Sequence, residues 1–301
     1  MTNRNYGLVQ VWHEGNMTPT ITLPVSHFPS WSLLVSITDD IYIDNNDTGI
    51  DQWSLNSTSK ISTLNADGDC YDLFVDHNQS LYCALPALNK VIRRSLNSTD
   101  DQTTTVAGTG CPGIAQDMLN HPMGTFVDID YTLYAADSGN NRIQLFYAGQ
   151  FNGITVAGKG APGTISLNFP TDIVLDGGGY LFIVDAFNDR IVGSDANGFQ
   201  CVAGCSGIGG LGLNQLNRPT VMAFDSYGNI FVTDNNNNRT QKFFLATNSC
   251  GEFHFTALLI EEKLDSNYGF IRIFTHPFLT HSYPDNRKKF LFFFLYICLR
   301  I

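Results

Sequence analysis

The chain has 301 residues, which is long enough to bury a substantial core as one large repeat domain or as two ordinary domains. Only 15% of the residues are charged and 43% are hydrophobic, and this composition excludes wholesale disorder. The formal net charge of -11 argues against nucleic acid as a partner, because affinity for phosphates comes largely from clustered Lys and Arg.

No targeting or anchoring segment is expected in the chain as written. Residues Met1–Gly7 are polar and turn-forming, which is not the pattern of a secretory signal peptide. The longest apolar run, Phe290–Leu299, is far shorter than the ~20 residues that cross a bilayer as a helix, so we expect no membrane span.

Two β-strands are predicted near the N-terminus, at residues 8–12 and 18–23. The segment Leu8-Val-Gln-Val-Trp12 is similar to Arg142-Ile-Gln-Leu-Phe146, which belongs to a unit that recurs further along. We therefore expect the chain to open with the two outer strands of such a unit, whose two inner strands are missing upstream.

Internal repeats are the strongest signal in this sequence. Two weaker copies, at residues 33–44 and 73–92, precede three clear ones. The clear copies begin at Pro122, Pro170 and Pro219. Each has an aspartate near the end of its second strand, at spacings of 48 and 49 residues: Asp137, Asp185 and Asp234. A second marker, Val-Ala-Gly, recurs at residues 106–108, 156–158 and 202–204.

Each unit is predicted to contain four short strands, because alternating apolar residues are interrupted every few positions by Asp, Gly and Asn turns. Four antiparallel strands repeated at this period describe one blade of a β-propeller. Five units and the N-terminal half unit predict an all-β, six-bladed β-propeller, with one blade split or incomplete between the two ends of the chain. The alternative is a fragment of a longer array.

The last 50 residues differ in composition from the repeats. They contain nine of the 22 Phe but one of the 27 Gly, and no repeat marker follows Cys250. We interpret residues 1–251 as the propeller, with outer strands of a split blade in 1–25 and five repeats in 26–251. Residues 252–301 are then an atypical Phe-rich tail. It is either a non-native extension or a blade-closing segment, in which Phe253–Ile260 and Gly269–Thr275 supply the two inner strands.

The motif Asp-x-x-Asn-x-Arg-Ile, preceded by Leu-Tyr/Phe-x-x-Asp, resembles the NHL repeat over about residues 8–250. Two copies depart from it. In one, Leu85, Leu88 and Lys90 replace the Asp, Asn and Arg, and in the other Gly49 replaces the Arg. The resemblance implies a propeller that acts as a binding platform.

A side chain repeated in every blade favours an architectural role, because Asp and Asn bond to nearby backbone amides in turns and Arg can pair with the carboxylate. We interpret the repeated residues as a structural turn motif: Asp137, Asn140, Arg142, Asp185, Asn188, Arg190, Asp234, Asn237 and Arg239.

An enzymatic function is the second alternative. Peptide-amidating lyases resemble NHL propellers and hold zinc with histidines in the central channel. Here only His121 precedes the Pro of an inner strand, with His27 as the one plausible helper, and one such histidine cannot complete a three-ligand site. We therefore expect no catalytic residue, no cofactor and no metal.

The favoured function is a non-catalytic scaffold that binds a protein or peptide through loops at the ends of the propeller. The candidate loop residues are His121, Met123, Phe169, Thr171, Arg218 and Thr220. The alternative is the substrate-recognition module of an NHL-type ubiquitin ligase in the cytoplasm. A RING domain is absent from this sequence, so a partner would have to supply it.

Cysteines and glycosylation sequons bear on the choice between these two functions. Seven Cys form no Cys-x-x-Cys pair, and one or two disulfides are expected. Asn-x-Ser/Thr sequons occur at six positions: Asn16, Asn46, Asn56, Asn78, Asn97 and Asn238. Oxidised cysteines and occupied sequons would favour an extracellular scaffold, or a piece of a longer extracellular repeat protein, over a cytoplasmic module.

Overall fold

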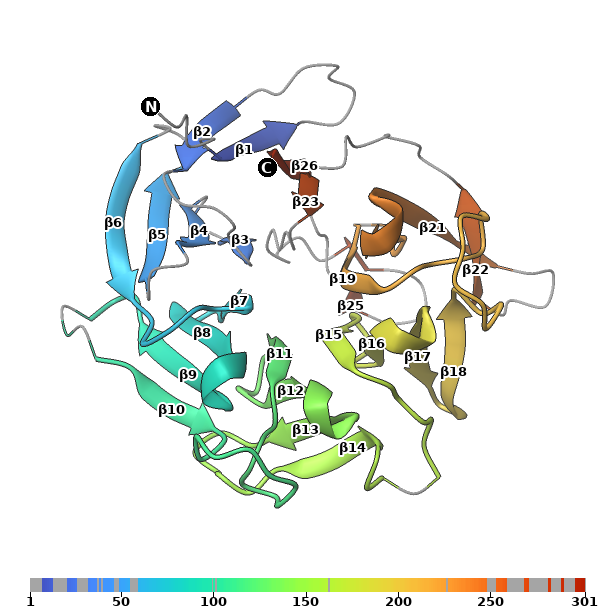
Figure 1. Cartoon of the computed structure of the whole chain (residues 1–301), viewed down its shortest axis with the longest axis horizontal. Helices are drawn as coiled ribbons and strands as arrows, with labels where there is room; N and C mark the ends of the chain where they lie inside the picture. Colours follow the sequence, from blue (N-terminus) through green and yellow to red (C-terminus); the bar gives the residue numbers. More distant parts are fainter. Residues whose placement is uncertain are drawn as a thin grey trace.

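The computed structural model shows a ring of β-sheets around a central axis (Figure 1). It describes residues 7–12, 21–25, 32–36, 38, 40–45, 49–54, 59–98, 100, 102–161, 163–225, 227–247, 253–258, 268–270, 281–282, 288–289 and 296–300.

Within these ranges, five sheets each contain four strands that are consecutive in the chain and pair antiparallel, and we number them as blades 1 to 5. Blade 1 comprises β3 (Leu33–Val35), β4 (Asp40–Asp44), β5 (Gly49–Ser54) and β6 (Lys60–Asn65). Blade 2 comprises β7 (Asp72–Val75), β8 (Ser80–Leu85), β9 (Lys90–Ser95) and β10 (Thr104–Ala107). Blade 3 comprises β11 (Pro122–Val127), β12 (Leu133–Asp137), β13 (Arg142–Phe146) and β14 (Ile154–Gly158). Blade 4 comprises β15 (Pro170–Leu175), β16 (Leu181–Asp185), β17 (Arg190–Asp195) and β18 (Gly198–Ala203). Blade 5 comprises β19 (Pro219–Phe224), β20 (Ile230–Asp234), β21 (Arg239–Thr247) and β22 (Phe253–Leu258).

The prediction of a six-bladed propeller is wrong, because the described structure shows five blades. Strand β22, which we considered as an inner strand of a sixth blade, pairs with β21 from Lys242↔Leu258 to Thr247↔Phe253. It is therefore the outermost strand of blade 5. The repeat markers end before this strand, and its pairing with the long strand β21 could not be read from them.

The two ends of the chain pair with each other in a separate sheet. It has the order β2-β1-β26-β23, from β1 (Gly7–Trp12), β2 (Ile21–Val25), β23 (Tyr268–Phe270) and β26 (Tyr296–Arg300). In Figure 1 this sheet lies between blade 1 and blade 5. It takes two strands from each end and is not one continuous repeat. A two-stranded ladder joins β24 (His281–Ser282) to β25 (Lys288–Lys289).

Hydrophobic side chains fill the spaces between neighbouring blades. One cluster joins Tyr42 of blade 1 to Leu73 of blade 2, and another joins Phe74 of blade 2 to Phe146 of blade 3. Two further clusters connect blades 3 and 4 and blades 4 and 5. Strand alternation places apolar residues on both faces of each sheet, and stacking with the next blade removes them from water.

Inner strands of adjacent blades are also tied by buried polar contacts. The Asp72 carboxylate accepts hydrogen bonds from the Thr125 backbone N–H at 2.7 Å and from its hydroxyl at 3.1 Å. Asp172 accepts one from the Met222 N–H at 2.9 Å. At Gly124 an added Cβ would lie 2.6 Å from Asp172 Cα, so blades 3 and 4 approach too closely there for any side chain.

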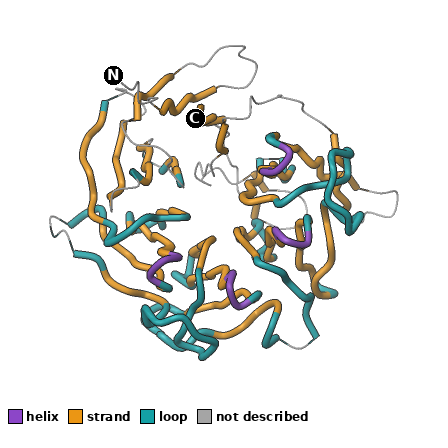
Figure 2. The backbone as a smooth tube through the Cα atoms, in the orientation of Figure 1, coloured by secondary structure: helices purple, strands orange, loops and turns teal. Residues whose placement is uncertain are grey.

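The direction of the strands defines two faces of the ring. The loops that lead from the outermost strand of one blade to the innermost strand of the next lie on what we call the connecting-loop face. The 3-10 turns between second and third strands share this face: η1 (Pro86–Leu88), η2 (Ser138–Asn140), η3 (Ala186–Asn188) and η4 (Asn235–Asn237) (Figure 2). The remaining turns, between first and second and between third and fourth strands, form the turn face.

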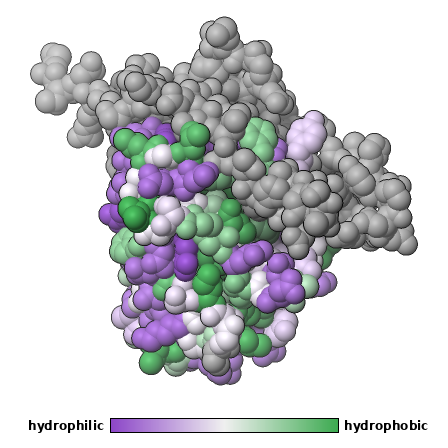
Figure 3. All heavy atoms as spheres, turned by 90° about the vertical axis from the view of Figure 1, so that its right-hand side faces the viewer, coloured by the Kyte–Doolittle hydropathy of each residue, from purple (hydrophilic) through white to green (hydrophobic). Residues whose placement is uncertain are grey.

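Seen from the side that carries blades 4 and 5, hydrophobic and hydrophilic residues are interspersed over the described surface (Figure 3). No helix among the described residues has both the length and the apolar character required to cross a membrane.

Candidate functional site

The residue that precedes each inner strand of blades 3 to 5 is anchored to the preceding blade by an Asn or Asp side chain. The anchor is an Asn or Asp at the end of a 3-10 turn, in the left-handed conformation that these residues tolerate. Its Oδ1 accepts the backbone N–H of the residue before the proline of the next inner strand. The pairs are Asn89 with His121 at 2.9 Å, Asn141 with Phe169 at 2.7 Å and Asp189 with Arg218 at 2.7 Å.

The anchored residues have positive φ themselves, of 52° at His121, 54° at Phe169 and 48° at Arg218. Such values are uncommon for residues with a Cβ and cost roughly 1–2 kcal/mol each. The anchoring hydrogen bonds hold this conformation in all three blades. The backbone positions from which the three side chains extend are therefore fixed on the connecting-loop face.

These side chains form a continuous row with Phe187 of η3. The rings of His121 and Phe169 lie 5.9 Å apart, and Phe169 stacks on Phe187 at 4.7 Å with an interplanar angle of 17°. The Arg218 guanidinium carbon lies 4.7 Å from the centre of the Phe187 ring. We call His121, Phe169, Phe187 and Arg218 the ring ladder. It spans blades 3 to 5, and 44% of the Phe187 side chain is exposed.

Arg218 differs from the other arginines of these blades in its ion pairing. Arg142, Arg190 and Arg239 each pair with a buried aspartate through Nε, at 2.6, 2.8 and 2.7 Å. Among the residues described, no carboxylate forms an ion pair with the Arg218 guanidinium.

Arg218 also lies within electrostatic range of Tyr71. Burial and, to a smaller extent, the carboxylates of Asp172 and Asp72 raise the pKa of Tyr71, Arg218 lowers it, and the resulting pKa is about 12. The phenol is therefore protonated at neutral pH and can act as a hydrogen-bond donor.

The other predicted loop residues do not join the ladder. Met123 is 8% exposed and Thr171 is 4% exposed, and Thr220 is half-buried, so all three mainly cover the starts of their own strands. The sequence interpretation missed Phe187, because the equivalent turn positions hold Gly139 and Asn236. An aromatic residue inside a polar turn was the available signal.

The repeated Asp, Asn and Arg residues lie together in each of blades 3 to 5. In blade 3, Asp137 Oδ2 accepts bonds from Asn140 at 2.8 Å and Arg142 at 2.6 Å, while its Oδ1 accepts the Asn120 N–H at 2.7 Å. The same three bonds recur at Asp185 and at Asp234.

The arginine of this motif holds the connecting loop that precedes its blade. The remaining Arg142 nitrogens donate to the carbonyl oxygens of Ile114, Ala115 and Met118, each at 3.0 Å. Arg239 binds the carbonyls of Leu211, Gly212 and Gln215 in the same way. The hydrogen bonds of these guanidinium groups go to backbone carbonyls of the protein or to the motif aspartate. The geometry therefore suits a role in fixing loops.

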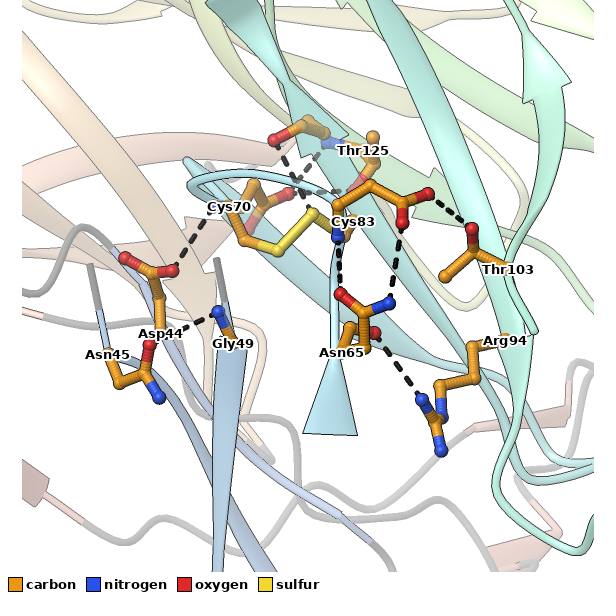
Figure 4. Close-up of a disulfide and its surroundings, with 12 residues drawn as sticks. Asp44, Asn45, Gly49, Asn65, Cys70, Cys83, Arg94, Thr103 and Thr125 are labelled. Carbon is orange, nitrogen blue, oxygen red and sulfur yellow. Dashed lines mark hydrogen bonds between the residues drawn. A yellow bond between two sulfur atoms is a disulfide. The ribbon is translucent and has the colours of Figure 1, made fainter. Parts of the chain in front are cut away.

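Blade 2, which lacks the motif, has a disulfide between the same two segments (Figure 4). Cys70 immediately precedes the Tyr71–Asp72 start of the inner strand, and Cys83 lies on β8. The Cys70 N–H also donates to Asp44 Oδ1 of blade 1 at 3.2 Å. In blade 3 the corresponding segments are joined by the Asn120–Asp137 hydrogen bond. A second disulfide joins Cys201 to Cys205 at the end of β18.

In the described part of the chain, no group of three or more His, Cys, Asp or Glu side chains is placed so that it could hold a metal ion. The rings of His77 and Tyr131 lie on the turn face with centres 4.6 Å apart and planes tilted by 34°. His27 lies outside the described residues.

No protein-family model and no curated protein sequence matches the chain. Solved structures do match. The streptogramin B lyase structure has a TM-score of 0.57 and is 12% identical, covering 86% of this chain and 75% of that chain. A nidogen–laminin complex has a TM-score of 0.58 and is 17% identical, covering 79% of this chain and 88% of that chain. The β-propeller domain of Cps50 (Swd1) from Myceliophteria thermophila has a TM-score of 0.55 and is 12% identical, covering 82% of this chain and 78% of that chain.

These neighbours are β-propellers, and at such identities the likeness shows the fold alone. They include a lyase as well as non-enzymatic propellers, so the fold is compatible with either kind of function. The resemblance to NHL repeats stays a prediction from the motif. The protein is a β-propeller.

Proposed function

We propose that this protein is a non-catalytic scaffold of the NHL type that docks a protein or peptide partner on its connecting-loop face. The ring ladder is the observation that carries the proposal. Three aromatic rings and an arginine from three blades form one row, and side-chain anchors hold three of these four residues at fixed backbone positions. Rigid, partly exposed aromatic residues and Arg are the side chains that most often dominate protein interfaces.

Exposed apolar side chains on the same face support the proposal. Ile114 is 73% exposed, Ile208 69% and Leu211 71%. Arg142 binds the carbonyl of Ile114, and Arg239 binds the carbonyl of Leu211, so two of these residues stand on loops that the turn motif immobilises. Exposed apolar residues also stand on the turn face, among them Ile129 at 65% and Tyr227 at 78%, so the test below compares the two faces.

The two disulfides support an extracellular scaffold over a cytoplasmic ligase module, because disulfides persist mainly in oxidising compartments. The sequon residues Asn78, Asn97 and Asn238 are exposed, which allows them to carry a glycan.

The test compares three forms of the full chain as bait for proteins secreted by the source cells. These are the wild type, Phe187→Ala in the ladder, and Tyr227→Ala, which removes a 78% exposed ring on the turn face. We expect a stoichiometric partner that binds the wild type and Tyr227→Ala and is lost from Phe187→Ala, with similar thermal midpoints for all three. A partner lost only from Tyr227→Ala, or catalytic turnover of the bound molecule, would overturn the proposal.

A further inference from the structure

The ring ladder ends in an arginine that forms no ion pair with a carboxylate of the described residues. Arg218 lies over Phe187 rather than beside a carboxylate. Asp189 binds the backbone of this residue, since its Oδ1 accepts the Arg218 N–H at 2.7 Å. A guanidinium stacked on a ring still has N–H donors along its edge, in the arrangement that matches a carboxylate.

The loops around Arg218 carry few charges. Apart from the turn motifs and the Cys111 thiol, the described ionisable groups of the connecting loops and 3-10 turns in blades 3 to 5 are Lys159, Arg218, His121, Asp117 and Asp189. The carboxylates of Asp172 and Asp72, which act on Tyr71 together with Arg218, are buried on the inner strands. Lys159 is close to the ladder, because its N–H donates at 3.0 Å to the carbonyl of Asn141, the residue that anchors Phe169. Positive and negative groups are therefore nearly balanced on this face.

The excess of negative charge in these blades is on the opposite face. Asp128, Asp176 and Asp225 lie in the turns between first and second strands, where each accepts backbone N–H bonds. Asp130 and Asp195 lie in turns of the same face. Lys242, which pairs with Asp225 at 2.9 Å, is the cation beside them. An acidic segment is consequently repelled from the turn face and can approach the ladder.

We propose that the ladder binds a peptide segment of its partner in which an Asp or Glu carboxylate is adjacent to an aromatic or large apolar side chain. The carboxylate pairs with the edge of Arg218, and the apolar side chain packs against the rings of Phe169 and His121. This inference rests on the proposed docking function of the same surface. It adds the chemical class of the ligand, which neither the fold nor its neighbours supply.

The probes are four biotinylated octapeptides on a streptavidin biosensor, each with one residue pair between Gly-Ser spacers. The pair is Asp-Phe, Asn-Phe, Asp-Ala or Lys-Phe. We expect the full chain to bind Asp-Phe roughly 10-fold more tightly than Asn-Phe or Asp-Ala, since a charged hydrogen bond and a ring contact are each lost. Lys-Phe is expected to bind least.

The variant series isolates Arg218. Arg218→Gln retains the backbone N–H that Asp189 binds, and should abolish the difference between Asp-Phe and Asn-Phe. Arg218→Lys retains the charge but not the planar edge, and should give an intermediate preference. Tyr227→Ala, on the turn face, should match the wild type.

Equal affinity for Asp-Phe and Asn-Phe, or weak binding of all four peptides, contradicts the inference. An equal effect of Arg218→Gln on both peptides contradicts it as well. The docking function is judged separately, by capture of the native partner with Phe187→Ala. If that capture depends on the ladder but not on Arg218, docking stands and the acidic ligand is wrong.

Discussion

The side-chain oxygen of Asn141 accepts a hydrogen bond from the backbone N–H of Phe169 at 2.7 Å, and this bond connects the helical turn of blade 3 to the inner strand of blade 4. Asn141 is in the left-handed conformation, with φ of 57°. The carbonyl of the same residue accepts the Lys159 N–H at 3.0 Å. One side chain and one carbonyl of Asn141 thus hold the two ends of the connecting loop between β14 and β15.

Replacing Asn141 should loosen that junction. In Asn141→Ala the positive φ becomes strained and the acceptor is lost, so the free energy of unfolding should fall by about 2 kcal/mol. Asn141→Asp preserves both features, as Asp189 does in blade 4, and should be close to the wild type. Urea unfolding of the two variants measures the difference. Equal losses in both would mean that the anchor does not stabilise the fold.

The turn motif should stabilise the fold through its buried carboxylate. Asp137→Ala leaves the Arg142 guanidinium largely buried without its counterion, and should lower the free energy of unfolding by about 3 kcal/mol or more. The matched control is Lys60→Gln. Lys60 is 40% exposed, and its buried partner Asp51 also accepts hydrogen bonds from Asn45 and Thr63, so the loss of Lys60 should cost clearly less than the loss of Asp137. Similar costs for the two variants would contradict the role assigned to the motif.

Much of the fold could be predicted from the sequence, because the evidence for each blade is local. Strand alternation and the turns at Asp137, Asp185 and Asp234 indicated four-stranded repeats. The number of blades was not local information. It depended on whether Phe253–Leu258 completed blade 5 or began another blade, and this segment has no repeat marker.

The candidate site was predictable only in part, for a similar reason. His121, Phe169 and Arg218 were identified as loop residues by their position before a proline. Their alignment with Phe187 depends on the spacing of blades in space. The anchors Asn141 and Asp189 occupy the variable position between Asn and Arg in the motif, so the repeat pattern did not identify them as anchors. The pairing of Cys70 with Cys83 likewise required three-dimensional proximity.

The stability of the fold should fall at alkaline pH through Tyr82. Burial raises the pKa of this phenol to about 12, and the Asp76 carboxylate, which accepts its hydroxyl hydrogen at 3.2 Å, raises it too. Because the unfolded phenol ionises near its ordinary pKa of 10.0, the stabilisation is complete below that pH and is lost as the pH rises toward about 12. Urea unfolding across this interval should show a shallower decline for Tyr82→Phe. Parallel declines in the two proteins would refute the assignment.

The two disulfides should contribute unequally. The Cys70–Cys83 bridge closes a loop with a sequence separation of 13, whereas Cys201–Cys205 has a separation of 4. Loop-closure entropy predicts a loss of about 3 kcal/mol for the paired Cys→Ser change at the first and less at the second. Denaturant unfolding of both paired variants tests this. The reverse order would show that blade 2 does not depend on its bridge in place of the turn motif.

Hydrogen–deuterium exchange of the full chain, with and without its captured partner, locates the surface on which the partner docks. Docking on the ladder predicts new protection in the connecting loops that carry it, at residues 113–122, 166–170, 186–190 and 210–219, and unchanged exchange in the turns at residues 128–132 and 225–229. Protection confined to those turns, with the ladder loops unchanged, would rule out docking on the ladder.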